Sequence, residues 1–370
     1  MIHGDIINHM AISTASETFV AVETTAEVKR IEPNRGAMNV ATKIMGEFGV
    51  GVVFMPLYSG LVYRAVPANN GNITLARNSE VMEVGKQIGV VRVHGSGFKS
   101  NHEVPVLNGP NLCRFSYSTR LHEQVACGLM PPTVYVRPGQ AYEPNPAITG
   151  NSVVIKYRSP EVGRYIERLE NNPAKINAAI KTINSRLRYE GVATDHDFMV
   201  QPYDPGRAIF QIESTTKGAA ALVKYANDST RPEVRVYCFP DNVGGKISIR
   251  PYAMYNLNSG APENVLLPID QTTVPKEIIL NAARVASGLL RIVGVNAAVM
   301  AVDQYLSSDG TFKVRSINCG NLAIGDRLVP AFKGLSGDLA ARVVRVAEHA
   351  HGQLLAEQLA TVALGRKCKF

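Results

Sequence analysis

The amino-acid sequence predicts a protein of the α/β or α+β class, because helical and strand patterns alternate along its whole length. The chain has 370 residues, of which 45% are hydrophobic, and this is ample for a large buried core shared by about two or three domains. Charged residues make up 19% and no long polar tract interrupts the chain, so disorder is not expected.

Residues 1–107 predict a small N-terminal α/β domain. Apolar residues recur at helical spacing over 37–48 and lead into an apolar strand at 52–55. After a turn at 69–72, which reads Asn-Asn-Gly-Asn, the same order returns with a helix at 81–88 and a strand at 89–93. Two helix–strand units in succession favour a domain of their own.

Residues 108–202 predict a second segment, in which Lys156 ends a β-branched strand. Its first helix is expected to stop at Gly128, because a glycine commonly follows the last helical turn. The expected elements are helices at 118–127, 161–170 and 174–189 and strands at 133–136, 152–157 and 198–201.

Residues 203–370 predict a third segment, which contains the strongest amphipathic helix of the chain at 278–292. A long helix is expected at its end, over 339–364. The expected strands are 234–239, 246–254, 299–305 and 311–317.

Charge and cysteine content narrow the function classes. The formal net charge of +8 favours anionic partners such as a nucleotide, but the basic residues are spread out and there is no Trp, so nucleic acid is not the expected partner. The five cysteines form no CxxC pair, which argues against a zinc or disulfide framework and favours a reducing cytoplasm. No apolar run is long enough to cross a bilayer and no secretory signal opens the chain, so a cytoplasmic protein is expected.

A hairpin near the end of the chain carries the first functional hint. Asp309-Gly310 between two alternating strands is a strong hairpin signal, and a two-residue loop there places Asp303 opposite Ser316. Because side chains alternate between the faces of a sheet, Asp303, Ser316 and Asn318 then share one face. Mg²⁺ would explain a carboxylate and an amide on an otherwise apolar hairpin. The alternative is that these residues only end strands at the surface.

The segment 295–318 resembles the metal hairpin of the ATP-grasp superfamily, and the helix at 276–292 resembles the helix before it. Three segments that precede the hairpin occur in the family's order: the entry segment 108–136, the lysine strand 153–158, and the hinge strand 198–203. The later motifs EVRVYCF, GGKISIRPYAM and YNLNSG occur in the order found in the glutathione synthetase and glutamate-tail ligase branch. The resemblance covers 108–330 and implies an ATP-grasp fold behind a small N-terminal α/β domain.

This resemblance implies a ligase that uses ATP and Mg²⁺ to join a carboxylate to an amine through an acylphosphate. The amine acceptor would be an amino acid or a peptide. The implied residues are Lys156, Gln201 and Tyr203 for the nucleotide, Arg235, Arg250 and Asn256 for catalysis, and Asp303 and Asn318 for the metal. A solvated lysine, a solvent-facing arginine and an ordinary turn asparagine remain the alternatives for Lys156, Arg235 and Asn256.

The chain departs from the family pattern in ways that favour a second hypothesis. Ser316 stands in place of the metal glutamate, Pro202 in place of an acidic hinge residue, and Gly163 is the one glycine of a reduced phosphate loop. The stretch 208–232 is longer than the family's connection, which indicates an insertion. The alternative function is therefore a non-catalytic ATP-grasp relative that serves as a nucleotide-binding or structural protein. The sequence leaves the oligomeric state open, including a homo-oligomer.

Overall fold

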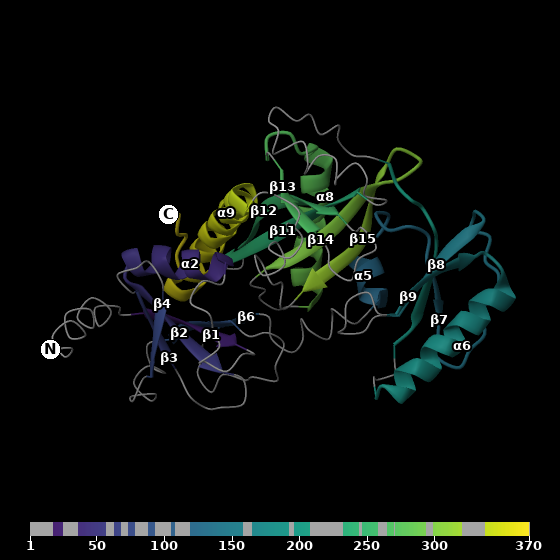
Figure 1. The fold of residues 1–370 in the computed structure, drawn as a ribbon, viewed down its shortest axis with the longest axis horizontal. Helices are drawn as coiled ribbons and strands as arrows, with labels where there is room; N and C mark the ends of the chain where they lie inside the picture. The colour runs from purple at the N-terminus through teal and green to yellow at the C-terminus, as the bar shows by residue number, and fades with distance from the viewer. Residues whose placement is uncertain are drawn as a thin grey trace.

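The computed structural model describes helices and strands that form three sheets in a row (Figure 1). The described residues are 18–24, 36–56, 63–67, 73–77, 88–92, 105–107, 119–157, 165–191, 196–207, 232–243, 246–257, 265–269, 271–293, 299–319 and 337–369.

The N-terminal sheet has the strand order β4-β3-β2-β1-β5-β6 among the described residues. Strands β1, β2, β5 and β6 run parallel, while β3 and β4 extend the sheet antiparallel beside β2. The bounds are β1 (Thr18–Thr24), β2 (Val50–Pro56), β3 (Tyr63–Pro67), β4 (Ile73–Arg77), β5 (Ile88–Arg92) and β6 (Val106–Leu107), with helix α2 (Gly36–Glu47) between β1 and β2.

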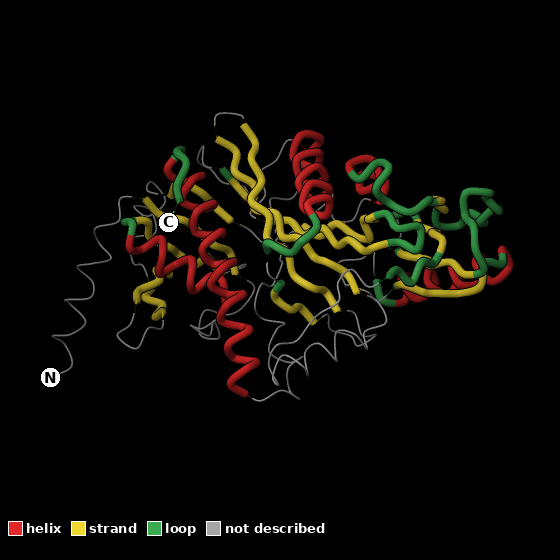
Figure 2. The backbone as a smooth tube through the Cα atoms, turned by 90° about the horizontal axis from the view of Figure 1, so that it is seen from above, coloured by secondary structure: helices red, strands yellow, loops and turns green. Residues whose placement is uncertain are grey.

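The middle sheet is antiparallel, in the order β7-β10-β8-β9, and lies at the far end of the molecule from the N-terminal sheet (Figures 1 and 2). Its bounds are β7 (Val134–Val136), β8 (Ser152–Lys156), β9 (Ile166–Glu170) and β10 (Phe198–Pro202), with α5 (Thr119–Val125) before it. Helix α6 (Pro173–Tyr189) covers one face and is capped by Asn172, whose Oδ1 accepts from the N–H of Ala174 at 2.9 Å.

The third sheet is antiparallel, in the order β13-β12-β11-β14-β15, and occupies the centre of the molecule. Its bounds are β11 (Pro232–Val243), β12 (Lys246–Leu257), β13 (Val265–Pro268), β14 (Met300–Leu306) and β15 (Phe312–Cys319). Helix α8 (Lys276–Val293) packs on one face, where alternate strand residues such as Val234, Val236 and Val302 join its apolar stripe.

Helix α9 (Gly337–Leu364) connects the N-terminal part of the structure with the central sheet, because it packs on both α2 and that sheet. The two helices lie close together at Gly352, where an added Cβ would lie 2.4 Å from Cβ of Val40 and 2.7 Å from the carbonyl oxygen of Ala37. One hydrophobic core therefore joins the N-terminal sheet, α2, α9 and one end of the central sheet.

The predicted class is confirmed: the chain has an α+β fold with helices packed on three sheets. The predicted helix at 161–170 is wrong where the structure describes it, because 166–170 form β9. This segment has apolar spacing that suits a helix, but pairing with β8 satisfies its backbone at the sheet edge. The predicted helix at 81–88 lies outside the described residues except for Ile88, which begins β5.

The domain boundaries at 107/108 and 202/203 remain a prediction. The sequence pattern places helix α9 in the third segment, and in the structure it packs against α2 of the first. Among the described helices, none combines the length and the apolar character that a membrane span requires.

Candidate functional site

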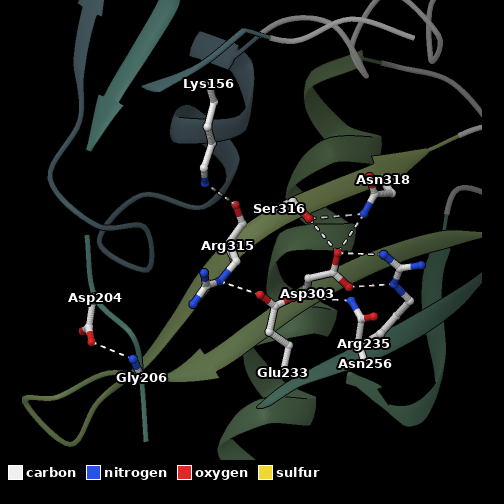
Figure 3. A network of polar contacts seen from close by, with 10 residues as sticks. All are labelled: Lys156, Asp204, Gly206, Glu233, Arg235, Asn256, Asp303, Arg315, Ser316 and Asn318. Carbon is white, nitrogen blue, oxygen red and sulfur yellow. Dashed lines mark hydrogen bonds and ion pairs between the residues drawn. The ribbon is translucent and has the colours of Figure 1, made fainter. Parts of the chain in front are cut away.

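The polar cluster lies on the face of the central sheet opposite α8 (Figure 3). Along β11 the side chains alternate, so that Val234 and Val236 join the core under α8 while Glu233 and Arg235 point to the other face. The cluster consists of Glu233 and Arg235 from β11, Asn256 from β12, Asp303 from β14, and Arg315, Ser316 and Asn318 from β15.

The predicted pairing of Asp303 with Ser316 is confirmed, although the loop differs from the predicted one. The N–H of Ser307 donates to the carbonyl of Thr311, so the loop has three residues, with Gly310 at φ +84°. This longer loop shifts the pairing of Gln304 by one residue, to Val314. A bulge then adds one unpaired residue, Arg315, to β15, and this second shift brings Asp303 back opposite Ser316.

The bulge also places Arg315 and Ser316 on the same face. Val314 and Ile317 both pack into the core under α8, so the extra residue falls between these two positions. The Arg315 and Ser316 side chains both reach carboxylates of the cluster, Glu233 and Asp303. A β-bulge commonly re-aims side chains in this way.

Asp303 is the centre of the cluster and is buried. Its Oδ1 accepts from Nε of Arg235 at 2.7 Å, and its Oδ2 accepts from Nη2 of Arg235 at 2.9 Å. Oδ2 also accepts from Oγ of Ser316 at 2.6 Å and Nδ2 of Asn318 at 2.9 Å. Burial alone would raise the pKa of Asp303, but the charge of Arg235 and these hydrogen bonds hold that pKa below its usual range.

Glu233 is a second buried carboxylate. Its Oε1 lies 2.6 Å from Nε of Arg315, and Nδ2 of Asn256 donates to its Oε2 over 3.4 Å. Burial raises the pKa of Glu233 to about 7, although Arg315 acts in the opposite direction. Asn256 itself is buried, and its Oδ1 has no hydrogen-bond partner among the described residues.

Lys156 joins the middle sheet to this cluster. Its Nζ donates to the carbonyl of Arg315 at 3.4 Å, so the lysine predicted for the nucleotide lies beside the hairpin (Figure 3). The Arg315 guanidinium lies over the ring of Tyr305 at 4.2 Å from its centroid. Sequence reasoning missed Glu233 and Arg315, and the signal for Glu233 was its place two residues before Arg235 on one alternating strand.

A second tie holds the two sheets together at the turn. Asp204 follows β10, and its carboxylate accepts from the hydroxyl of Ser307 and from the N–H of Ser308, the latter at 3.0 Å. The N–H of Arg207 donates to the carbonyl of Leu306 at 2.7 Å. The segment after β10 is thereby fixed to the hairpin.

The other sequence-predicted residues lie apart from the cluster. Gln201 is buried in β10 and donates to Oγ1 of Thr133 at 2.9 Å, and the ring of Tyr203 lies 3.6 Å beneath the guanidinium of Arg168. The structure does not bring Arg250 into the site, because its guanidinium pairs with Asp241 at 2.7 Å and with Glu357 of α9.

The residues as arranged do not fit Mg²⁺. A carboxylate has roughly four acceptor positions, and Asp303 already accepts four hydrogen bonds. Ser316 offers a neutral hydroxyl, and Asn318 turns its Nδ2 rather than an oxygen to the carboxylate. In the parts of the chain that the structure describes, no three His, Cys, Asp or Glu side chains are grouped to hold a metal. This geometry gives no support to the predicted metal roles of Asp303 and Asn318.

Comparison with known proteins gives the fold its class. The sequence matches no protein-family model and no curated protein. Its structure is similar to that of the D-cycloserine synthetase DcsG, with a TM-score of 0.50 at 13% identity, over 92% of this chain and 99% of that one. Lower similarity is found to a D-alanine–D-alanine ligase from Bacillus anthracis, with a TM-score of 0.46 at 13% identity, over 95% and 99% of the two chains. An ADP complex of the N5-carboxyaminoimidazole ribonucleotide synthetase PurK has a TM-score of 0.46 at 12% identity, over 84% and 72%.

The chain therefore has the ATP-grasp fold, as its sequence predicts. At these identities the likeness concerns the fold alone, and it does not single out the glutathione synthetase and glutamate-tail ligase branch.

Proposed function

We propose that this protein is an ATP-dependent ligase that joins a carboxylate to an amine. The observation that carries the proposal is the contact of Lys156, at the end of β8, with the hairpin residue Arg315 across from it. The Lys156 ammonium thus reaches the backbone of a hairpin that is distant in sequence and carries a second basic residue. The ATP-grasp fold supports the assignment of this place to the phosphates of a nucleotide.

The reaction needs charge neutralisation more than a protein nucleophile. A carboxylate oxygen attacks the γ-phosphorus of ATP, ADP leaves, and an acylphosphate forms. The amine nitrogen then attacks the acyl carbon and loses a proton, and inorganic phosphate leaves. Lys156, Arg235 and Arg315 are suited to stabilise the transferring phosphoryl group, because guanidinium and ammonium groups bind its oxygens.

The remaining roles follow from the cluster and from the family resemblance. Glu233 is assigned to hold Arg315 in place, because its Oε1 lies 2.6 Å from the Arg315 Nε. Asn256 holds Glu233 and is assigned to the transferring group. Gln201 and Tyr203, on and just after β10, are assigned to the nucleotide base.

An isotope-transfer experiment tests this proposal. The protein is incubated with ATP, pools of amino acids, and carboxylic acids that carry ¹⁸O in the carboxylate. Acylphosphate chemistry moves one ¹⁸O atom from the carboxylate to the released phosphate, which mass spectrometry detects. Phosphate released without ¹⁸O would show hydrolysis of ATP instead and would count against ligation.

A second candidate function is a non-catalytic ATP-grasp protein that binds a nucleotide. The observation that favours it is that Asp303 already accepts four hydrogen bonds from the protein, one of them from Ser316. This candidate predicts no phosphate release from any pool in that experiment, together with ATP binding in a separate calorimetric titration.

A further inference from the structure

The internal pairing of Asp303 has a consequence for how a nucleotide binds. Arg235 lies opposite Asp303 on the neighbouring strand and contacts both of its oxygens, and its side chain is only 12% exposed. A bidentate pair of this kind fixes both the position and the charge of the guanidinium. The positive charge beside Asp303 is therefore supplied by the protein itself, through the Arg235 side chain.

The cluster around this pair is rich in positive charge. Arg235 and Arg315 pair with the two carboxylates, Asp303 and Glu233. Lys156 reaches the backbone carbonyl of Arg315, close enough for its charge to lower the pKa of Glu233 (Figure 3). Even with both carboxylates ionised, the group carries a net positive charge. A divalent cation is repelled by such a group, whereas a polyphosphate is attracted to it.

The basic side chains are equipped to bind phosphate oxygens. A guanidinium has five N–H donors, so the two bonds from Arg235 to Asp303 do not exhaust it. Arg315 is held in place by Glu233 below it and by the ring of Tyr305, and its side chain is 18% exposed. Fixed donors lose little conformational entropy when they bind an anion.

We infer that this site binds the triphosphate of a nucleotide without a divalent cation, with Arg235 supplying the charge beside Asp303. The inference rests on the proposed nucleotide site but concerns a separate property of it. The anion that it fits is fully ionised ATP rather than its magnesium complex.

Calorimetric titration of the full chain with ATP tests the inference, once in EDTA and once in excess Mg²⁺. We expect binding in EDTA that is as tight as binding with Mg²⁺ or tighter. Binding that is more than about tenfold tighter with Mg²⁺, a difference of about 1.4 kcal/mol, would overturn the inference and leave the proposed nucleotide site intact. Absence of binding in both buffers would overturn both.

Two further arms sharpen the experiment. Inorganic tripolyphosphate in EDTA should compete with ATP, because the inference concerns the phosphates; failure to compete would contradict it. Ser316→Glu places a carboxylate next to Asp303, and we expect this variant to lose about tenfold in affinity for ATP in EDTA and to regain it with Mg²⁺. Titration with Mn²⁺, followed by electron paramagnetic resonance, should show no stoichiometric site in the unmodified protein without nucleotide. A tight Mn²⁺ site there would refute the inference.

Discussion

Arg235 and Asp303 lie directly opposite each other on β11 and β14 and form a buried two-point ion pair, with N–O distances of 2.7 and 2.9 Å. Removal of one partner leaves the other charge buried and unpaired, which lowers the free energy of unfolding by roughly 3–5 kcal/mol. We predict that Arg235→Met and Asp303→Leu each lower the free energy of unfolding by such an amount, as measured by urea denaturation.

The double variant separates this effect from ordinary packing loss. With both charges replaced by apolar side chains, most of the lost stability should return, because no unpaired charge remains. If the two losses simply add, the pair does not act as one unit.

Arg250 is predicted to act on stability and not on ligand binding. It links β12 to Asp241 and to Glu357 of α9, away from the cluster. Arg250→Met should lower the free energy of unfolding by roughly 3 kcal/mol while leaving ATP affinity unchanged. A selective loss of ATP affinity with normal stability would instead support the catalytic role that the family resemblance implies for Arg250.

His351 is predicted to make the fold sensitive to acid. It lies in α9 among the rings of Tyr237, Phe239 and Tyr252, and neither ring nitrogen has a hydrogen-bond partner among the described residues. Burial lowers its pKa from 6.5 to about 3, so between these values the unfolded chain takes up a proton that the folded chain does not. Stability therefore falls as pH falls, by about 2 kcal/mol between about pH 7 and 5.

Denaturation at both pH values checks this prediction with two variants. His351→Phe should remove its share of the acid loss, whereas His349→Phe, at an exposed position of the same helix, should keep it. Equal pH dependence in the two variants would show that His351 is not the group responsible.

Two helical glycines form a matched pair for the packing of α9 on α2. A methyl group at Gly352 would collide with Val40 and with the Ala37 carbonyl, whereas one at Gly46 would meet nothing within 4 Å. Gly352→Ala should cost about 1–3 kcal/mol, and Gly46→Ala should stabilise α2 by up to about 1 kcal/mol. Thermal unfolding of both variants checks this; similar shifts would mean that the helices can move apart freely.

Much of the fold could be predicted because the apolar periodicity of long elements such as α8 and β11 is set by burial on one face. Short or edge elements could not: β9 has apolar spacing that suits a helix, and only its pairing with β8 decides its conformation. The alignment of Asp303 with Ser316 follows from a two-residue loop at Asp309-Gly310, but the structure reaches the same alignment through a three-residue loop and a bulge, neither of which could be predicted. Nothing local in a sequence marks a bulge of this type when no glycine is present.

Some of the candidate site depends on partners that no spacing reveals. The family resemblance implies a catalytic role for Arg235, but its pairing with Asp303 depends on which strand lies beside β11. The same holds for Arg250, whose partner Glu357 comes from a helix more than a hundred positions away. Strand order and helix docking, which the sequence pattern does not specify, decide which charges are left for a ligand.

The nucleotide site is tested most directly by the affinity for ATP of Lys156→Ala, compared with Lys175→Ala. Lys156 contacts the hairpin through Arg315, whereas Lys175 is 58% exposed on α6 and pairs with Glu170. Calorimetry should show an affinity loss of about tenfold or more for Lys156→Ala, with an unchanged melting temperature, and no loss for Lys175→Ala. Equal ATP affinity in the two variants and the unmodified protein would contradict the assignment of the phosphates to this place.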